Sequence, residues 1–134
     1  MDQETPFQFQ PVLVGETSTV RPSAANRIAS TPEPPYYVVV FTSQRTTGEN
    51  GYGVVADRMV ELASDQPGFL GVESVRDTDG FGITVSYWES EAAIAGWKAQ
   101  SEHLVAQEKG KRGWYEHYEL RVAKVVRAYG KRGP

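Results

Sequence analysis

The sequence predicts an α+β domain in which four strands and two helices follow one another in the order β-α-β-β-α-β. Three observations support this prediction. Two segments, 52–63 and 93–104, repeat apolar residues at helical spacing. Three others, 36–44, 69–76 and 81–88, are rich in β-branched and aromatic residues, and the last two flank an Asp-Gly turn. This order is that of the ferredoxin-like fold, whose right-handed crossovers place both helices on one face of an antiparallel sheet.

The first strand and the first helix show different patterns. Residues 36–44 carry apolar side chains at both parities, so this strand must be covered on both faces. Along 52–63 the apolar residues recur three and four positions apart, which is the stripe of an amphipathic helix. A Gln-Pro-Gly run at 66–68 then stops the helix.

The next two strands form a predicted hairpin. Residues 69–76 and 81–88 are joined by Asp-Thr-Asp-Gly, which is a strong turn signal. Side chains alternate along the second of these strands. One face carries Phe81, Ile83, Val85 and Tyr87, and the other carries Gly82, Thr84, Ser86 and Trp88.

The second helix and the last strand complete the order. Ser90 is expected to cap the helix, because a serine oxygen accepts a hydrogen bond from N–H groups of the first turn. We expect Trp114 and Tyr115 in a turn or a single helical turn, and the last strand over 120–129. The buried face of the helix is expected to carry Ala93, Ile94, Trp97, Ser101 and Leu104.

The composition changes near residue 35. Residues 1–35 hold six of the eight prolines, which remove backbone donors and fix φ, so we interpret this segment as a proline-rich arm and linker. A single ferredoxin-like domain is expected over 36–130, followed by a tail, 131–134. The sheet face away from the helices needs a cover. A second copy of the chain, giving a two-fold homodimer, is the economical cover, and the arm is the alternative.

Length and composition exclude several classes of protein. The chain has 134 residues, a net charge of −3 and no cysteine, which excludes disulfides, thiolate metal sites and cysteine nucleophiles. No apolar run reaches the roughly 20 residues of a membrane span, and the N-terminus lacks the pattern of a signal peptide. We therefore expect a cytoplasmic protein that binds neither membranes nor nucleic acid.

Residues 98–134 hold nine basic and four acidic residues. We interpret them as a solvated edge, and a rim for an anionic ligand is the alternative.

The sequence holds few candidates for chemistry and none of the common catalytic motifs. Two histidines, His103 and His117, are too few for a transition-metal site, so neither a metal nor a cofactor is expected. His103 follows Trp97 by a net rotation of about 240° on a straight helix, so the two do not share a face. A surface histidine is the simpler interpretation of His103, and a base between helices and sheet is the functional one. His117 is expected to be exposed beside Glu116.

Two further basic residues, Arg45 and Arg58, lie where they could reach an anion. Ordinary salt links are the simpler interpretation of both residues.

Several stretches carry a family resemblance. They are Thr31-Pro-Glu-Pro-Pro-Tyr-Tyr, Phe41-Thr-Ser-Gln-Arg-Thr, Gln66-Pro-Gly-Phe-Leu-Gly-Val-Glu-Ser, Ile83-Thr-Val-Ser-Tyr-Trp, and the spaced series Trp97, Glu102-His103, Gln107, Gly110, Trp114-Tyr115 and Arg121. Over about residues 31–130 the chain thereby resembles the antibiotic biosynthesis monooxygenase domain family. The resemblance implies a dimeric α+β barrel, in agreement with the periodicity.

The resemblance leads to two functional hypotheses. The first is a monooxygenase without metal or flavin, acting on an aromatic, phenolic or quinol substrate. In it, His103 removes a proton, and Tyr87 or Tyr115 donates to the developing anion. The pocket would be lined by Phe41, Val85, Trp88 and Trp97. The second hypothesis is a homodimeric module that binds a small ligand or partner without catalysis, its aromatic residues serving mainly as core. The two differ in whether His103 faces a cavity or solvent.

Haem degradation is a third and minor hypothesis. In the haem-degrading members, the resemblance calls for an asparagine on the first strand, a tryptophan on the second helix and a histidine ten residues later. Here the first strand, 36–44, has no asparagine, and the residue ten positions after Trp97 is Gln107. The triad is therefore not reproduced.

Overall fold

The computed structural model describes residues 27–48, 52–107 and 113–131, while the side chains of 52–57 and 102–107 lie outside that description. The chain forms the predicted α+β order. Its elements are β1 (Tyr36–Arg45), α2 (Tyr52–Ser64), β2 (Phe69–Arg76), β3 (Phe81–Trp88), α3 (Glu91–Gln107) and β4 (Tyr115–Val125).

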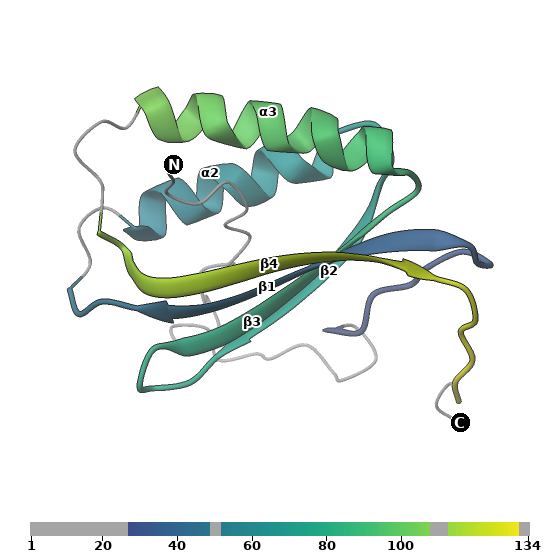
Figure 1. Ribbon diagram of the computed structural model, residues 1–134, viewed down its shortest axis with the longest axis horizontal. Coiled ribbons are helices and arrows are strands. Elements are labelled where there is room, and N and C mark those ends of the chain that lie inside the picture. Colours follow the sequence, from purple (N-terminus) through teal and green to yellow (C-terminus); the bar gives the residue numbers. More distant parts are fainter. Residues whose placement is uncertain (1–26, 49–51, 108–112, 132–134) are drawn as a thin grey trace.

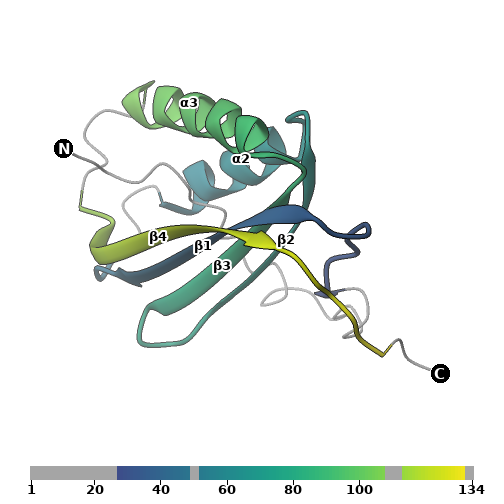
Figure 2. The ribbon, with the colours of Figure 1, turned by 45° about the vertical axis from the view of Figure 1, so that its right-hand side comes forward.

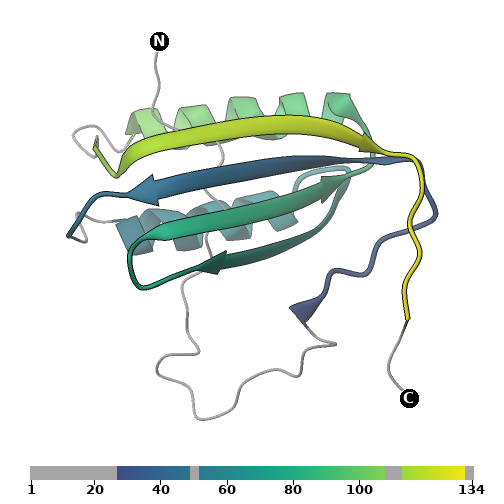
Figure 3. The ribbon, with the colours of Figure 1, turned by 60° about the horizontal axis from the view of Figure 1, so that its bottom comes forward.

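The four strands form one antiparallel sheet in the order β2-β3-β1-β4. Both helices lie on the same side of this sheet (Figures 1 and 2). We call that side the helix-covered face and the other the open face, which Figure 3 shows toward the viewer. The ferredoxin-like fold predicted from the sequence is confirmed.

The core lies between the helix-covered face and the two helices. α3 contributes the buried Ile94, Trp97 and Ser101, as the helical spacing predicts, while the side chain of Leu104 lies outside the described residues. The buried apolar cluster consists of Val39, Met59, Ala63, Trp88, Ile94, Trp97 and Trp114.

Local signals of the sequence define two junctions correctly. In the β2–β3 turn, the Asp77 carboxylate accepts hydrogen bonds from the backbone N–H groups of Asp79 and Phe81, both at 2.9 Å. Gly80 adopts a φ of 92°, which a residue with a side chain rarely takes. At the start of α3, Ser90 Oγ accepts a hydrogen bond from Ala93 N–H at 3.0 Å, so Ser90 is the predicted N-cap.

The limits predicted for the last strand are wrong. β4 begins at Tyr115, which was expected in a turn, and ends at Val125 rather than at residue 129. Its pairing explains both limits, because Tyr115 lies opposite Arg45 at the end of β1 and Val125 opposite Tyr36 at its start. β4 has β1 as its neighbour in the sheet, so its ladder begins and ends with that strand.

The described part of the arm, residues 27–35, runs beside the β2 edge of the sheet (Figure 3). Ala29 N–H donates a hydrogen bond of 2.8 Å to the Glu73 carboxylate. The Thr31 hydroxyl donates one of 3.0 Å to the hydroxyl of Tyr36. The arm therefore contacts its own domain at this corner, and the rest of the arm lies outside the described residues.

Candidate functional site

The region between the helix-covered face and the helices, which we call the aromatic compartment, holds two groups of aromatic side chains. At one end, the rings of Trp88 and Trp97 stack with centroids 6.5 Å apart and an angle of 20° between their planes. Phe69 meets Trp88 edge-on at 5.3 Å. These contacts join β2, β3 and α3, so the two tryptophans hold the second helix on the sheet.

The other end of this compartment holds a second aromatic group. The buried Phe41 lies 5.3 Å from Tyr115 and 5.6 Å from Tyr118, and the two tyrosines are 6.0 Å apart. This group lies where β4 begins, and the end of α3 lies above that part of the sheet in Figure 1. Of the predicted site residues, Phe41, Trp88, Trp97 and Tyr115 therefore lie on the helix-covered side, with Trp88 and Trp97 in the first group and Phe41 and Tyr115 in the second.

Hydroxyl groups of the sheet face the same compartment. Ser86 is fully buried and accepts a hydrogen bond of 2.9 Å from the Trp88 indole N–H. The hydroxyls of Ser74 and Thr84 are hydrogen-bonded to each other at 2.7 Å. These buried hydroxyls are therefore hydrogen-bonded within the core, as buried polar groups generally are.

Arg76 is a polar residue of this compartment that the sequence patterns alone did not single out. Its Nη2 donates to Ser43 Oγ at 2.7 Å, and its Nη1 donates to the carbonyl oxygens of Ser43 and Gly80. The guanidinium also lies over the Tyr115 ring, 5.8 Å from its centroid. The available sequence signal was position, because Arg76 lies on the same face of β2 as Val72, which is partly buried and packs against the core.

Two predicted site residues lie on the other side of the sheet. Val85 and Tyr87 alternate with Ser86 and Trp88 along β3, so they project from the open face. The structure does not bring Val85 and Tyr87 together with Trp97, because successive side chains of a strand point to opposite faces. Any role of Val85 and Tyr87 in a site belongs to the open face.

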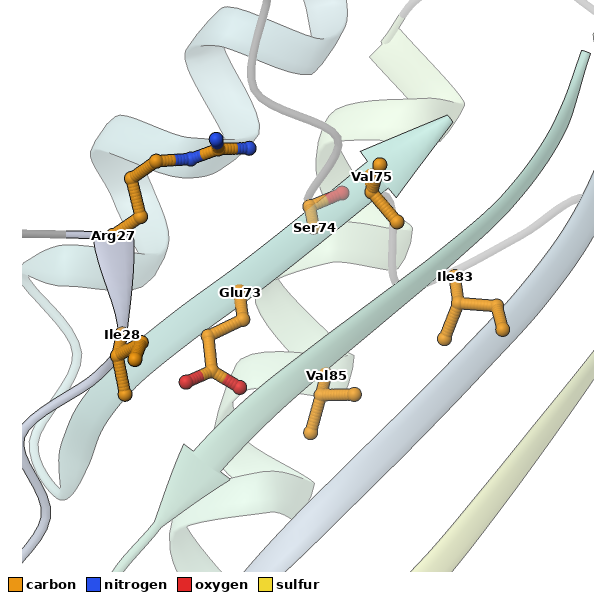
Figure 4. A pocket seen from close by; sticks show the side chains of 7 residues that line it. All are labelled: Arg27, Ile28, Glu73, Ser74, Val75, Ile83 and Val85. Carbon is orange, nitrogen blue, oxygen red and sulfur yellow. The ribbon is translucent and has the colours of Figure 1, made fainter. Parts of the chain in front are cut away.

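A groove of about 520 Å³ lies on the open face, between the arm and strands β2 and β3 (Figure 4). At its edge, Glu73 accepts a hydrogen bond of 2.6 Å from the Tyr87 hydroxyl as well as the one from Ala29. Burial, followed by the hydrogen bond to the Glu73 carboxylate, raises the pKa of Tyr87 above its ordinary value. The groove is lined by Arg27, Ile28, Glu73, Ser74, Val75, Ile83 and Val85.

The raised pKa of Tyr87 predicts an alkaline loss of stability. The unfolded chain ionises this tyrosine near pH ~10, whereas the folded chain keeps it protonated. The stabilising effect of the Tyr87 hydroxyl is therefore full below that pH and declines above it.

We expect Tyr87→Phe to lower the free energy of unfolding by about 1.5–3 kcal/mol near pH 8, since the lost hydrogen bond has a charged acceptor, and by less at higher pH. Urea unfolding near pH ~8 and again above pH ~10 measures how much stability the variant loses at each pH. Tyr129→Phe, at a 92% exposed tyrosine, is the control. An equal deficit at both pH values would contradict the prediction.

The two histidines differ in what the structure describes. His117 lies on the open face of β4 with its side chain 72% exposed, and it is paired with Glu119 at 3.0 Å rather than with Glu116. This hydrogen bond lowers the pKa of Glu119. His103 belongs to the last turns of α3, but its side chain lies outside the described residues, so its predicted role stays a prediction.

The two candidate anion-binding arginines differ in their surroundings. Arg45 donates hydrogen bonds to the backbone carbonyls of Trp114 and Gly48, at 3.3 and 3.0 Å. Arg58 is exposed on α2. No three acidic or histidine side chains of the described residues come together as metal ligands. In the same residues, neither helix has the length and apolarity needed to cross a bilayer.

Four antiparallel strands with both helices on one face define a ferredoxin-like α+β domain, and comparison with known proteins identifies its family. Residues 35–109 match the family model described as antibiotic biosynthesis monooxygenase. YqjZ of Bacillus subtilis, an uncharacterised protein, is 60% identical over 100 residues, covering 75% of this chain and 88% of its own. The chain belongs to the antibiotic biosynthesis monooxygenase family.

Two more distant relatives have named activities. The jasmonate monooxygenase ABM of Pyricularia oryzae is 28% identical over 67% of this chain, which spans only 43% of that protein. SnoaB of Streptomyces nogalater, a cofactor-independent oxygenase, was solved in a mutant form and aligns with a TM-score of 0.55 at 16% identity, covering 72% of this chain and 98% of its own. The structural match supports the fold alone.

Proposed function

We propose that this protein is a monooxygenase that works without metal or flavin on an aromatic phenol or quinol. The observation that carries the proposal is the aromatic compartment on the helix-covered face, in which Phe41, Trp97 and Tyr115 come from a strand, a helix and the β4 edge. Aromatic walls with a few polar groups favour a flat aromatic ligand. Family membership and the named activity of the jasmonate monooxygenase support the reaction class.

The reaction needs no external reductant, because the substrate supplies the electrons. A base takes the proton of a phenolic hydroxyl, and a ring carbon of the resulting phenolate forms a bond to O₂. Protonation gives a hydroperoxide, whose O–O bond then breaks as the same carbon loses its hydrogen. One oxygen atom stays as a carbonyl and the other leaves as water, so phenol and O₂ yield quinone and water. The protein's tasks are to hold the ring, accept the proton and stabilise the anion.

We assign the base to His103. The chain has two histidines, and His117 lies on the open face in a pair with Glu119, away from the aromatic compartment. His103 belongs to the end of α3 that lies above the start of β4, where Tyr115 contributes to the compartment (Figure 1). Tyr115 is the donor to the developing anion in this assignment, since Tyr87 projects from the other face.

Oxygen uptake with 1-naphthol and with 1,4-naphthohydroquinone tests the proposal. We expect uptake above the protein-free rate and incorporation of a single labelled atom from ¹⁸O₂ into the product. His103→Ala is expected to lower kcat by about 10²–10⁴-fold, the usual contribution of a general base.

His117→Ala is the matched control and should keep the wild-type rate. Equal rates for His103→Ala and the wild type would contradict the assignment of the base. Calorimetric binding of both compounds without uptake or labelled product would contradict the monooxygenase and leave a ligand-binding module.

We also propose that a second copy of the chain covers the open face. Val75, Phe81 and Ile83 lie together there and are 63%, 47% and 37% exposed. The described part of the arm covers only the corner at Glu73, so these side chains remain in contact with solvent. An apolar sheet face of this kind packs well against another sheet, and a two-fold axis brings identical patches together.

A further inference from the structure

Arg76 is held in one orientation on the helix-covered face. Three of its five N–H groups donate to Ser43 and Gly80, and the guanidinium lies over the Tyr115 ring. On its other side it lies flat against Gly82, where an added Cβ would be 2.7 Å from Cζ and 3.0 Å from Nε. The glycine therefore makes room for the guanidinium, which is positioned before any ligand arrives.

The positive charge of Arg76 has no negative partner in the described part of the chain. All its hydrogen-bond acceptors are neutral oxygens, and no described carboxylate lies within ion-pair distance of it. Its Nε–H is buried and meets no acceptor among the described residues. A guanidinium stays charged at every physiological pH, and leaving such a group without a counter-charge is costly. Within the described residues, the guanidinium is therefore bound by neutral acceptors alone and has room for an anion as a further partner.

We propose that Arg76 binds the carboxylate of an aromatic acid whose ring lies in the aromatic compartment. This rests on the compartment assigned under the proposed function, and it adds that the substrate is an acid. A carboxylate fits because it is ionised at neutral pH, as Arg76 is, whereas a phenol near pKa ~10 is mostly neutral. Two N–H groups of Arg76 remain for it, which is the number that a bidentate carboxylate accepts. Phe41 and Tyr115, in contact at 5.3 Å, supply the adjoining aromatic wall.

Calorimetry with 2-naphthoate and its neutral analogue 2-naphthamide tests this proposal on the full chain. The two compounds have the same ring and nearly the same shape, so their difference in affinity measures recognition of the charge. We expect the wild type to bind the acid at least about 10-fold more tightly than the amide, as hydrogen bonds to charged groups allow. Arg76→Gln should reduce this preference to less than about twofold.

Two other variants separate recognition from folding. Arg121→Gln makes the same change of charge at an exposed arginine of β4 and should keep the preference for the acid. Gly82→Ala leaves Arg76 in the sequence but places a methyl group where the guanidinium lies, so it should also abolish the preference. Far-UV circular dichroism reports whether each variant is folded. If Arg76→Gln does not fold, the affinities of Gly82→Ala test the proposal instead.

Three results would overturn the proposal. The first is equal affinity of the wild type for the acid and the amide, and the second is the absence of binding heat from either compound. The third is an equal loss of both affinities in Arg76→Gln, which would indicate that Arg76 has a purely structural role. The measurement does not involve turnover. A protein that prefers 2-naphthoate through Arg76 but consumes no oxygen would support this inference while contradicting the monooxygenase.

Discussion

Replacing Trp97 by alanine is expected to lower the free energy of unfolding by about 3–5 kcal/mol, as large aromatic-to-alanine changes in cores do. Trp97 is fully buried and stacks on Trp88, which is equally buried and receives Phe69 edge-on. Its removal opens a cavity where α3 meets the sheet. Because whole domains are stable by only about 5–15 kcal/mol, this single change removes a large share of the total.

Urea unfolding followed by circular dichroism measures this loss, at one protein concentration for all variants because an oligomer's stability depends on it. Tyr129→Ala is the control, since it also removes an aromatic ring but at a site that is 92% exposed. We expect its effect to stay within about 0.5 kcal/mol. A loss below about 1 kcal/mol for Trp97→Ala would contradict the core role of this residue.

Placing a charge on the open face is expected to dissociate the proposed dimer. Ile83 lies on the inner strand β3, opposite Val75, so Ile83→Asp would bury two carboxylates against apolar surface in a two-fold assembly. We expect the dissociation constant to rise at least about a hundredfold. Sedimentation at micromolar concentration should then show the 14.8 kDa chain in place of a species of twice that mass.

Val122→Asp is the matched control for this change. Val122 is an apolar side chain of β4 with 51% exposure, but it pairs with Val39 and so belongs to the helix-covered side of the sheet. This variant should keep the mass of the wild type. A monomeric wild type would overturn the proposed dimer, and so would an Ile83→Asp variant of unchanged mass.

The fold could be predicted from sequence because its signals are local. The pattern of apolar and β-branched residues indicated β2 and β3, and the Asp-Gly turn indicated the hairpin that connects them. Ser90 marked the start of α3. The limits of β4 could not be predicted in this way. They depend on the ladder with β1, in which residues about 80 positions apart are paired, and no local pattern contains that information.

The candidate site was less predictable, for a related reason. Tyr87 and Trp88 are neighbours in sequence and aromatic in kind, yet the pleat sends them to opposite faces. Arg76 was missed because its surroundings come from three places: Ser43 on β1, Gly82 on β3 and Tyr115 on β4. A charged residue at an inward parity of a strand is the one sequence signal that would have drawn attention to it.

The three tryptophans of the chain, Trp88, Trp97 and Trp114, are all buried in the core, with at most 3% of their surfaces exposed. The tryptophan fluorescence of the folded protein therefore arises from the core beneath the helices. It should be blue-shifted, and the close Trp88–Trp97 pair should share its excitation energy. A compound that enters this region should quench the emission, whereas one that binds on the open face should leave it nearly unchanged. The protein thus carries an internal optical probe of which face of the sheet a ligand occupies.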